Sequence, residues 1–411
     1  MVERIAPGGR ALLRAPGGVV FARGGLPGER VRVRIERAAR GVRHGVVVEV
    51  LEPSADRVAP DCALHPRCGG CDLLDLAETA RAAVKLDIVR DALARIGKLD
   101  QPTVERALRP MRSLGPGDDG TRRRASVVLS GGHATFSAPD SHERVPIDRC
   151  PALHPTLERG LAALAAARGP DGLRAHLACD DREGAVLAVE RDAGLARGFV
   201  DAGGRGAAVT STDEAFGDPS LVGEVSSGAW PCRSDAGVFA QATRFGGGAI
   251  RDEVLRAAAL APGERVLELF SGSGHLTIPL VAAGAVVDAV EGDARAVRFC
   301  RDNVALLAAG GGAIGDAAAR ATVRCAHIDD DLRWRDAPDV VVADPPRTGF
   351  PALAPLTARL TPRRFVLVSC DPATGARDLA ALLARGRRLA TLVPIDAFPR
   401  TSHVEWVAAL D

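Results

Sequence analysis

A cysteine and a glutamate near the end of the chain have the clearest potential for covalent chemistry. Cys370 follows the apolar run 365–369 and precedes an Asp-Pro pair, which is typical of a helix N-terminus. A helix N-terminus lowers the pKa of a nearby thiol, so Cys370 is a candidate nucleophile, although chance could place one of nine cysteines here. Glu405 lies in the predicted strand 404–410 and could serve as a base, but its spacing alone favours a solvent-facing carboxylate.

A glycine-rich segment predicts a site for a nucleoside-type ligand. The apolar run 265–270 is followed by Ser-Gly-Ser-Gly-His, and glycines beyond a strand let backbone amides approach a ligand. Thr277 stands where a dinucleotide fingerprint would place a third glycine, which argues against NAD. Glu291 ends the next predicted strand about twenty residues on, where an acid can accept hydrogen bonds from ribose hydroxyls. A plain turn is the alternative.

A further candidate, Asp344, begins an Asp-Pro-Pro-Arg segment directly after the apolar run 340–343. Ligands of open parallel sheets bind beyond the carboxyl ends of the strands, near the point where the strand order reverses. The fourth strand of a doubly wound sheet lies beside the first, so we expect Asp344 to face the same pocket as the glycine-rich segment. The alternative is a simple loop start.

The elements that would position these residues form a regular α/β pattern in the last third of the chain. Compact apolar runs suit buried parallel strands, and helical stretches lie between them. The runs are 265–270, 285–290, 340–343 and 365–369. This alternation predicts a doubly wound, Rossmann-like sheet and therefore an α/β fold class.

Residues 1–54 are predicted to form a small β-barrel. Short β-branched runs, of which 31–35 alternates with period two, are separated by turn signals at 24–25 and 27–28. OB-like barrels of this kind commonly bind single-stranded nucleic acid, and a scaffold barrel without that role is the alternative. The β-branched runs predicted to form strands of this barrel are 19–22, 31–35 and 46–51.

The rest of the chain divides into a central mixed α+β domain, residues 55–232, and a C-terminal domain, residues 233–411. Within the central domain, a helical stretch at about 76–96 could dock on the C-terminal domain. Residues 101–120 contain several prolines and are predicted to be a connector.

Four cysteines of the central domain could bind a metal. Cys62, Cys68 and Cys71 have the spacing C-x5-C-x2-C, and Cys150 is a distant fourth. In a cytosolic protein such a set is more typical of metal binding than of disulfides. Spacing alone does not separate a zinc ion from an iron–sulfur cluster, because both accept four thiolates. The cysteines expected to be ordinary buried residues are Cys179, Cys232, Cys300 and Cys325.

Charge and hydropathy patterns narrow the classes of function. The net charge of +1 indicates no partner, but residues 1–60 hold eleven Arg against six Asp or Glu, and 122–124 form a second basic cluster. Such clusters are typical of surfaces that bind phosphate groups. A basic surface that contacts only solvent would show the same pattern. The first residues lack the apolar segment of a signal peptide, and the longest apolar stretch, 276–290, is interrupted and too short to span a bilayer. We therefore expect a cytosolic protein without a membrane segment.

Five segments, in this order, resemble the RNA 5-methyluridine methyltransferase family over nearly the whole chain. They are Pro27-Gly28-Glu29, Phe270-Ser-Gly-Ser-Gly, Asp344-Pro-Pro-Arg-Thr-Gly, Ser369-Cys-Asp-Pro-Ala-Thr and Phe398-Pro-Arg-Thr-Ser-His-Val-Glu. The resemblance implies a TRAM-like barrel, a cluster-bearing central domain and a Rossmann-like S-adenosylmethionine domain. Three positions depart from the family pattern: Asp371 replaces Asn, Arg400 stands where His is frequent, and Thr243 precedes a Gly-rich run in place of an Asn-containing segment.

The resemblance also implies roles for individual residues. Cys370 would be the nucleophile and Glu405 the base. The S-adenosylmethionine site would be lined by Gln241, Phe270, Glu291 and Asp344, with His275 and His327 as further contacts. Phe239 would lie near a flipped base. A [4Fe-4S] cluster with a structural role would be held by Cys62, Cys68, Cys71 and Cys150.

The chemistry that the resemblance implies is methylation of carbon 5 of a uridine in RNA. Thiolate addition at C6 turns the pyrimidine into an enolate that can accept a methyl group, and a base then removes the C5 proton so that the thiol can leave. The target base must be extruded for this attack. We expect a monomer, with 23S rRNA the favoured substrate and tRNA the close alternative. Two rivals are cytosine C5 methylation and a catalytically silent RNA-binding or folding factor.

Overall fold

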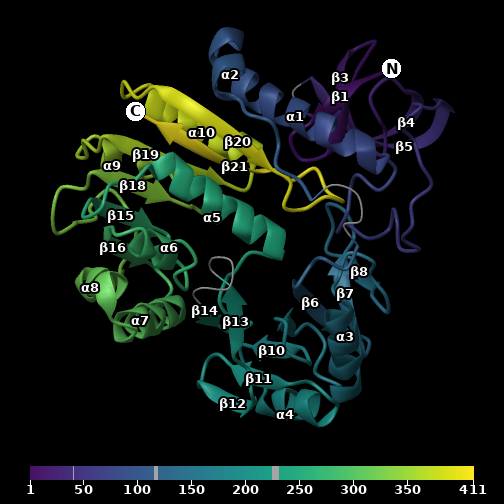
Figure 1. Cartoon of the computed structure of the whole chain (residues 1–411). Helices are drawn as coiled ribbons and strands as arrows, with labels where there is room; N and C mark the ends of the chain where they lie inside the picture. The colour runs from purple at the N-terminus through teal and green to yellow at the C-terminus, as the bar shows by residue number, and fades with distance from the viewer. Residues whose placement is uncertain (40, 115–118, 225–230) are drawn as a thin grey trace.

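The computed structural model describes residues 1–39, 41–114, 119–224 and 231–411. Within these ranges the chain forms an N-terminal sheet, a central mixed sheet and a C-terminal α/β sheet (Figure 1). Helix α1, Glu78–Arg95, runs between the N-terminal strands and the C-terminal domain. No helix of the described residues combines the length and the apolar character needed to cross a membrane.

The N-terminal sheet has five strands in the order β1-β2-β3-β5-β4. Backbone hydrogen bonds of Val2 with Glu29 (2.8 Å) and with Gly28 (3.0 Å) bring β1 back to the start of β4, so the sheet curls into a partly open barrel. The three predicted strands are confirmed, and β1 and β2 add two that the apolar pattern did not indicate. The bounds are β1 Val2–Ala6, β2 Arg10–Ala15, β3 Gly18–Arg23, β4 Arg30–Ala39 and β5 Val42–Glu52.

The C-terminal domain is built on a seven-stranded sheet with the order β17-β16-β15-β18-β19-β21-β20. The strands from β17 to β19 run parallel, and β21 and β20 complete the sheet by antiparallel pairing. The predicted doubly wound sheet is confirmed, and β18 lies beside β15 as expected. The bounds are β15 Arg265–Leu269, β16 Val286–Glu291, β17 Thr322–Cys325, β18 Val340–Ala343, β19 Arg364–Ser369, β20 Leu389–Ile395 and β21 Glu405–Leu410.

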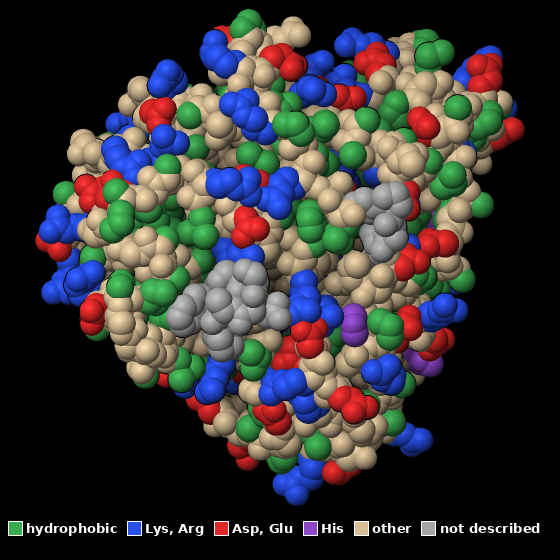
Figure 2. Space-filling model, viewed as in Figure 1, with side chains coloured by type: hydrophobic (Ala, Val, Ile, Leu, Met, Phe, Trp, Pro, Cys, Tyr) green, Lys and Arg blue, Asp and Glu red, His purple; other side chains and the backbone are tan. Residues whose placement is uncertain are grey.

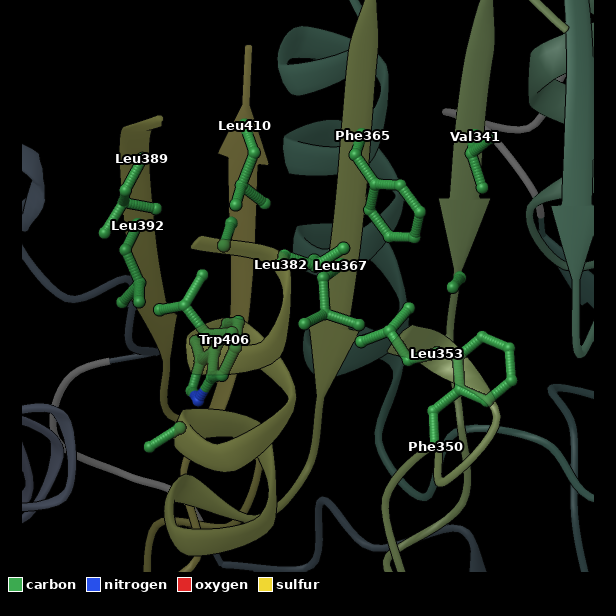
Figure 3. Packing of buried hydrophobic residues seen from close by; sticks show 14 of the residues in the cluster. Val341, Phe350, Leu353, Phe365, Leu367, Leu382, Leu389, Leu392, Trp406 and Leu410 are labelled. Atoms are coloured by element: carbon green, nitrogen blue, oxygen red, sulfur yellow. The ribbon is translucent and has the colours of Figure 1, made fainter. Parts of the chain in front are cut away.

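Helices cover both faces of this sheet, because alternate side chains of each apolar strand point to opposite faces. One face packs against α1, α9 and α10, and the other packs against α5, α6, α7 and α8. Figure 3 shows Phe365, Leu367 and Trp406 of the first face beside Leu353 of α9 and Leu382 of α10. The bounds are α5 Arg244–Ala258, α6 Thr277–Ala282, α7 Ala294–Ala309, α8 Gly312–Arg320, α9 Leu353–Thr357 and α10 Pro372–Leu383.

Helix α10 approaches the sheet closely at Gly375. A Cβ atom at this position would lie 2.3 Å from Cζ2 of Trp406 and 2.4 Å from Oγ of Ser369. A larger residue would push the helix away from β19 and β21, because such distances are far below van der Waals contact. The close packing therefore fixes the start of α10 against the ends of these strands.

The central domain has a second seven-stranded sheet, in the order β12-β11-β10-β9-β6-β7-β8. Helices α3, Pro155–Ala167, and α4, Ala193–Asp201, share a core with it, which matches the mixed, β-leaning pattern predicted here. The bounds are β6 Arg124–Ser130, β7 His133–Ser137, β8 Arg144–Pro146, β9 Arg174–Ala178, β10 Val186–Val189, β11 Gly206–Val209 and β12 Glu214–Gly217. A hairpin of β13, Leu221–Glu224, and β14, Pro231–Ser234, follows.

Helix α1 confirms the helix predicted at about 76–96 and docks on the C-terminal domain. Val89 and Leu93 lie in the same core as Leu379 of α10, while Ile88 lies in the core of the barrel. The connector predicted at 101–120 is partly wrong, since α2, Gln101–Ala107, forms there and its Val104 joins the same C-terminal core. Residues 115–118 of that segment lie outside the described residues.

Lys85 of α1 is completely buried, which is rare for a lysine. Its Nζ donates hydrogen bonds to Oδ1 of Asp396 and, over 2.8 Å, to the carbonyl oxygen of Phe398. Burial lowers the pKa of Lys85, and the carboxylate of Asp396 opposes that shift. A buried ion pair therefore ties α1 to the segment between β20 and β21, residues 396–404.

We expect Lys85→Met to lower the free energy of unfolding by about 3–5 kcal/mol, because the Asp396 carboxylate would remain buried without its partner. Urea unfolding followed by circular dichroism measures this loss. The matched control is Lys98→Met at the chain's other lysine, which is exposed and should change stability by no more than about 0.5 kcal/mol. Equal effects of the two substitutions would contradict a stabilising role for the buried pair.

Candidate active site

The predicted site residues lie along one edge of the C-terminal sheet. Phe270, Asp344 and Cys370 directly follow the parallel strands β15, β18 and β19, and Glu291 ends β16. Glu405 begins β21, which runs in the opposite direction, and therefore lies at the same edge. Open α/β sheets bind ligands at this edge, beyond the carboxyl ends of their parallel strands.

Strand register brings the predicted nucleophile and base together. Ser369 of β19 pairs with Trp406 of β21, so the next position sets Cys370 opposite Glu405. Neighbouring strands of a sheet lie only about 4.8 Å apart. The pairing of two backbones, and not a chance meeting of side chains, therefore sets the relation between these two residues.

Glu405 is 3% exposed, so the solvent-facing position that its spacing favoured is wrong. Burial raises the pKa of Glu405 to about 8, with a smaller contribution from Asp344 and an opposing effect of Arg347. Burial also raises the pKa of Asp344 to about 7. Carboxyl groups with pKa values near neutrality can accept and donate protons at physiological pH.

Cys370 is half-buried, and its surroundings oppose ionisation. Burial raises the pKa of its thiol to about 12, with contributions from Glu405, Asp344 and Asp371, whereas Arg347 opposes the rise. The expectation that the start of α10 would lower this pKa is therefore wrong. One reason is that the carboxylate of Asp371 itself caps α10, accepting hydrogen bonds from the backbone nitrogens of residues 373 (3.0 Å) and 374 (2.8 Å).

The glycine-rich segment begins with a strained residue. Phe270 has a φ of 65°, in the left-handed region that residues other than glycine seldom adopt. Its ring meets the edge of Phe350 with 5.0 Å between centroids. The backbone nitrogen of Gly272 donates a 3.0 Å hydrogen bond to Oε2 of Glu291. A strained backbone conformation persists only where surrounding contacts stabilise it. The glycine-rich segment and Glu291 therefore form one preformed rim at this edge of the sheet.

Gln241 and His275 meet at the first turn of α5. A Cβ atom on Gly247 would lie 3.3 Å from Cβ of Gln241 and 3.3 Å from Cε1 of His275. Nε2 of His275 lies 3.0 Å from the carbonyl oxygen of Gly247. Thr243 caps the helix, because its Oγ1 accepts a 3.0 Å hydrogen bond from the backbone nitrogen of Gly246. The Gly-rich run after Thr243 therefore leaves room for Gln241 and His275 against the helix.

Two other predicted contacts are exposed residues. His327 is exposed and follows β17, next to Ala326, whose backbone nitrogen donates a 2.9 Å hydrogen bond to the carbonyl oxygen of Glu291. Phe239 is 75% exposed, although large aromatic side chains are usually buried. An aromatic ring in this position is free to contact a ligand.

Two charged residues of this edge were not predicted to belong to the site. Glu268 of β15 is 1% exposed; burial raises its pKa to about 8, and Asp344 and Glu291 add to the shift. Arg347 lowers the pKa of both Cys370 and Glu405. A signal for Glu268 was present in the sequence, because a glutamate interrupts the apolar run just before the glycine-rich segment.

The four cysteines of the predicted metal site line one cavity of about 340 Å³. Its walls also include Arg122 and residues 397–401 of the segment that leads to Glu405. The four are Cys62, Cys68, Cys71 and Cys150. Among the residues that the structure describes, no three His, Cys, Asp or Glu side chains are grouped closely enough to hold a metal ion.

The second basic cluster is not an open basic face. Arg123 donates to the carbonyl oxygen of Asp180 (2.9 Å), and Arg124 donates to that of Asp235 (3.0 Å). Arg122 lies over the ring of Phe398, 5.9 Å from its centroid. These guanidinium groups stabilise the fold. Figure 2 shows Lys and Arg side chains interspersed with Asp and Glu over the face of the molecule.

The buried carboxyl group of Glu405 should make the stability of the protein fall as pH rises. The ordinary pKa of this group is 4.5, whereas the folded protein raises it to about 8. Between these values the folded state binds more protons than the unfolded state, so the free energy of unfolding decreases with pH. Glu405→Gln cannot lose that proton, and we expect its stability to decrease less over the same interval.

Urea unfolding of both proteins at about pH 5 and about pH 8 measures this difference. Glu105→Gln is the control, because Glu105 is exposed and its replacement should follow the wild-type profile. Parallel profiles of the wild type and Glu405→Gln would contradict the raised pKa of Glu405.

Comparisons with known proteins identify relatives along the whole chain. A 23S rRNA (uracil(1939)-C(5))-methyltransferase of Halomonas elongata is 33% identical over 445 residues, which cover 100% of this chain and 89% of the relative. An uncharacterized RNA methyltransferase of Thermosynechococcus vestitus is also 33% identical, over 450 residues that cover 100% of this chain and 96% of the relative. No family model matches the chain.

Among solved structures, the tRNA (uracil-54, C5)-methyltransferase of Pyrococcus abyssi, in complex with S-adenosyl-L-homocysteine, has a TM-score of 0.73. The match covers 100% of this chain and 98% of that chain at 21% identity, and so shows a shared fold over the full length. Together with the full-length relatives, this agrees with the family that the sequence motifs resemble. The chain therefore belongs to the RNA (uracil-C5) methyltransferase family and is an S-adenosylmethionine-dependent enzyme that modifies RNA.

Proposed function

We propose that this enzyme methylates carbon 5 of a uridine in 23S rRNA, with Cys370 as the nucleophile and Glu405 as the base. The strand register that sets these residues opposite each other is the observation that carries the proposal. Relatives named for 23S rRNA match 97–100% of the chain and support that substrate. A tRNA uridine is the second candidate, because the structural neighbour is named for a tRNA uracil.

The proposed reaction uses the two residues in sequence. The Cys370 thiol first loses its proton to solvent, the thiolate then adds to C6 of the uracil ring, and the electrons of the C5–C6 double bond pass into an enolate that makes C5 nucleophilic. S-adenosylmethionine, when bound, would supply the methyl group, and its positive sulfonium would counter the carboxylate charges that oppose ionisation of Cys370. After methyl transfer, Glu405 takes the proton from C5, the double bond reforms, and the bond between sulfur and C6 breaks.

The S-adenosylmethionine site would lie along the rim of the sheet edge. Glu291 accepts a hydrogen bond from the glycine-rich segment, and its place at the end of β16 suits contact with ribose hydroxyls. The packing of Gln241 and His275 against the first turn of α5 supports a place for them in the same site. The residues proposed to line it are Gln241, Phe270, Glu291 and Asp344, with His275 and His327 as further contacts.

RNA contacts are proposed for two other parts of the chain. The exposed ring of Phe239 could stack on the extruded base, since base stacking on aromatic side chains is a general mode of single-strand recognition. The N-terminal barrel, proposed to be TRAM-like, has the partly open five-stranded form that commonly binds nucleic acid. The monomeric state and the cytosolic location stay predictions.

We also propose that Cys62, Cys68, Cys71 and Cys150 hold a [4Fe-4S] cluster. Their shared cavity supplies the four thiolate donors that such a cluster needs, each for a different iron. Donors spread around a cavity suit a cluster better than a zinc ion, which would draw all four sulfurs into one tetrahedron. The guanidinium group of Arg122 in the cavity wall suits the negative charge of thiolates. The cluster would be structural, because methyl transfer from a sulfonium needs no electron.

Protein purified without oxygen should be brown and contain about four iron and four sulfide per chain. Cys71→Ser should lose both the colour and the iron, and its unfolding midpoint should decrease. Cys325→Ser is the matched control, because this cysteine lies outside the set and is exposed; the expectation that it would be buried is wrong. A colourless wild-type preparation loaded with zinc would count against the cluster.

RNA carrying 5-fluorouridine should trap the enzyme covalently, because a C5 fluorine cannot leave as a proton and the sulfur then stays bound to C6. We expect a complex stable to denaturing electrophoresis that needs S-adenosylmethionine, forms more readily with 23S rRNA fragments than with tRNA, and is absent from Cys370→Ala. Cys325→Ala should still form it, as a control for cysteine removal in general.

Preferential trapping with tRNA would assign the enzyme to tRNA. Failure of the wild type to trap any RNA would favour a silent RNA-binding factor instead. Cytosine methylation is tested separately, by mapping the methyl label on transcripts that carry labelled cytosine or uracil.

A further inference from the structure

The segment 396–404, which leads to Glu405, is held by a side chain from the cysteine-rich part of the chain, residues 62–72. Asp72 accepts two hydrogen bonds from Ser402: one from its backbone nitrogen (2.6 Å) and one from its Oγ (2.6 Å). Ser402 is 3% exposed whereas Asp72 is an exposed residue, so the two bonds are partly shielded from water. A single carboxylate therefore fixes both the backbone and the side chain of a residue close to Glu405.

The N-terminal barrel closes over the same pair at Gly9, in the turn between β1 and β2. A Cβ atom on Gly9 would lie 1.9 Å from Oδ2 of Asp72 and 2.7 Å from Oγ of Ser402. Only a residue without a side chain fits there while the two hydrogen bonds remain. The barrel, the cysteine-rich part of the chain and the segment leading to Glu405 thus meet at one point.

Further contacts join the segment 396–404 to residues near the cysteines. Arg400 donates to both oxygens of Asp61 (2.9 and 2.8 Å), and its carbonyl oxygen accepts a 3.2 Å hydrogen bond from the backbone nitrogen of Leu73. Residues 400–402 and 404 are all buried, and Glu405 follows directly at the start of β21. The path by which the chain enters β21 at Glu405 therefore depends on where Ser402 is held, in addition to the strand pairing.

We propose that Asp72 is a positioning residue for Glu405, acting through Ser402 under the cover of Gly9, and that release of the methylated RNA depends on it. This rests on the proposed function, since it takes Glu405 as the base. In the release step Glu405 takes the C5 proton, the electrons of that C–H bond form the C5–C6 double bond, and the pair of the S–C6 bond returns to the sulfur of Cys370. Addition and methyl transfer come earlier, so a displaced Glu405 leaves a methylated covalent adduct.

The test is a single-turnover reaction of Asp72→Ala with an unmodified 23S rRNA fragment and methyl-labelled S-adenosylmethionine. The labelled protein–RNA adduct should accumulate, and free methylated RNA should appear about 10–100-fold more slowly than with the wild type. Asp72→Asn can still accept from the Ser402 nitrogen and donate to its Oγ, and should restore most of the release rate. A merely destabilised protein would form less adduct and less product together, which would overturn the positioning role.

Gly9→Ala tests the same junction without touching the cysteine-rich part of the chain. Gly8 is its matched control, because both glycines have positive φ (87° for Gly8, 74° for Gly9), but a Cβ on Gly8 would meet nothing within 4 Å. Both alanine variants carry similar backbone strain, and only Gly9→Ala should accumulate the methylated adduct. Equal behaviour of the two would overturn the proposal.

Trapping with 5-fluorouridine RNA separates this inference from the function on which it rests, because trapping does not require the base. Asp72→Ala and Gly9→Ala should trap like the wild type. If the wild type fails to trap, the proposed function fails. If the wild type traps and Asp72→Ala releases product at the wild-type rate, the function stands and only the role of Asp72 is overturned.

Discussion

The antiparallel pairing of β21 with β19 is the constraint on which the site depends. The carboxyl ends of parallel strands gather at one edge of a sheet, but a residue that begins a strand reaches that edge only if its strand runs the other way. β21 does so, and its register with β19 sets Glu405 opposite Cys370. Because hydrogen bonds between backbones fix this relation, it is insensitive to side-chain rotamers. The close approach of α10 at Gly375 then holds the ends of both strands in place.

The same edge contains several carboxyl groups whose burial is unfavourable. Glu268 and Glu405 are buried and Asp344 is half-buried, and burial raises the pKa of each. Neutral carboxyl groups in a packed sheet lower the stability of the fold, so the two apolar cores on either side of the sheet must outweigh that cost. The segment that leads to Glu405 receives additional support from outside the sheet, through Lys85 and Asp72. The arrangement fits an active site, where local stability is given up for reactivity.

The sequence predicted the strands of the catalytic sheet and the place of β18 beside β15, because each strand is a compact apolar run with clear boundaries. It also placed Phe270, Asp344 and Cys370 at strand ends, as the structure does, but did not predict Glu268 or Arg347 at this edge. Helix α2 was not predicted, because it is short and prolines lie close to it in the sequence. Asp100, which caps the helix through the backbone nitrogen of Thr103, was a signal for it. The pKa of Cys370 was predicted in the wrong direction, because the effect of a helix end can be read locally whereas burial and carboxylates from other strands cannot. The bond from Ser402 to Asp72 joins residues 330 positions apart, and no local pattern indicates such a contact.

The high pKa of Cys370 has a consequence for the enzyme between turnovers. A thiol with a pKa of about 12 is almost entirely protonated at neutral pH, and the protonated form reacts slowly with peroxides and electrophiles. Burial, with a smaller effect of the neighbouring carboxyl groups, therefore protects this sulfur from oxidation to sulfenic acid. In the proposed reaction a cationic methyl donor would favour ionisation of this sulfur, so the proposed nucleophile would stay protonated until the donor binds.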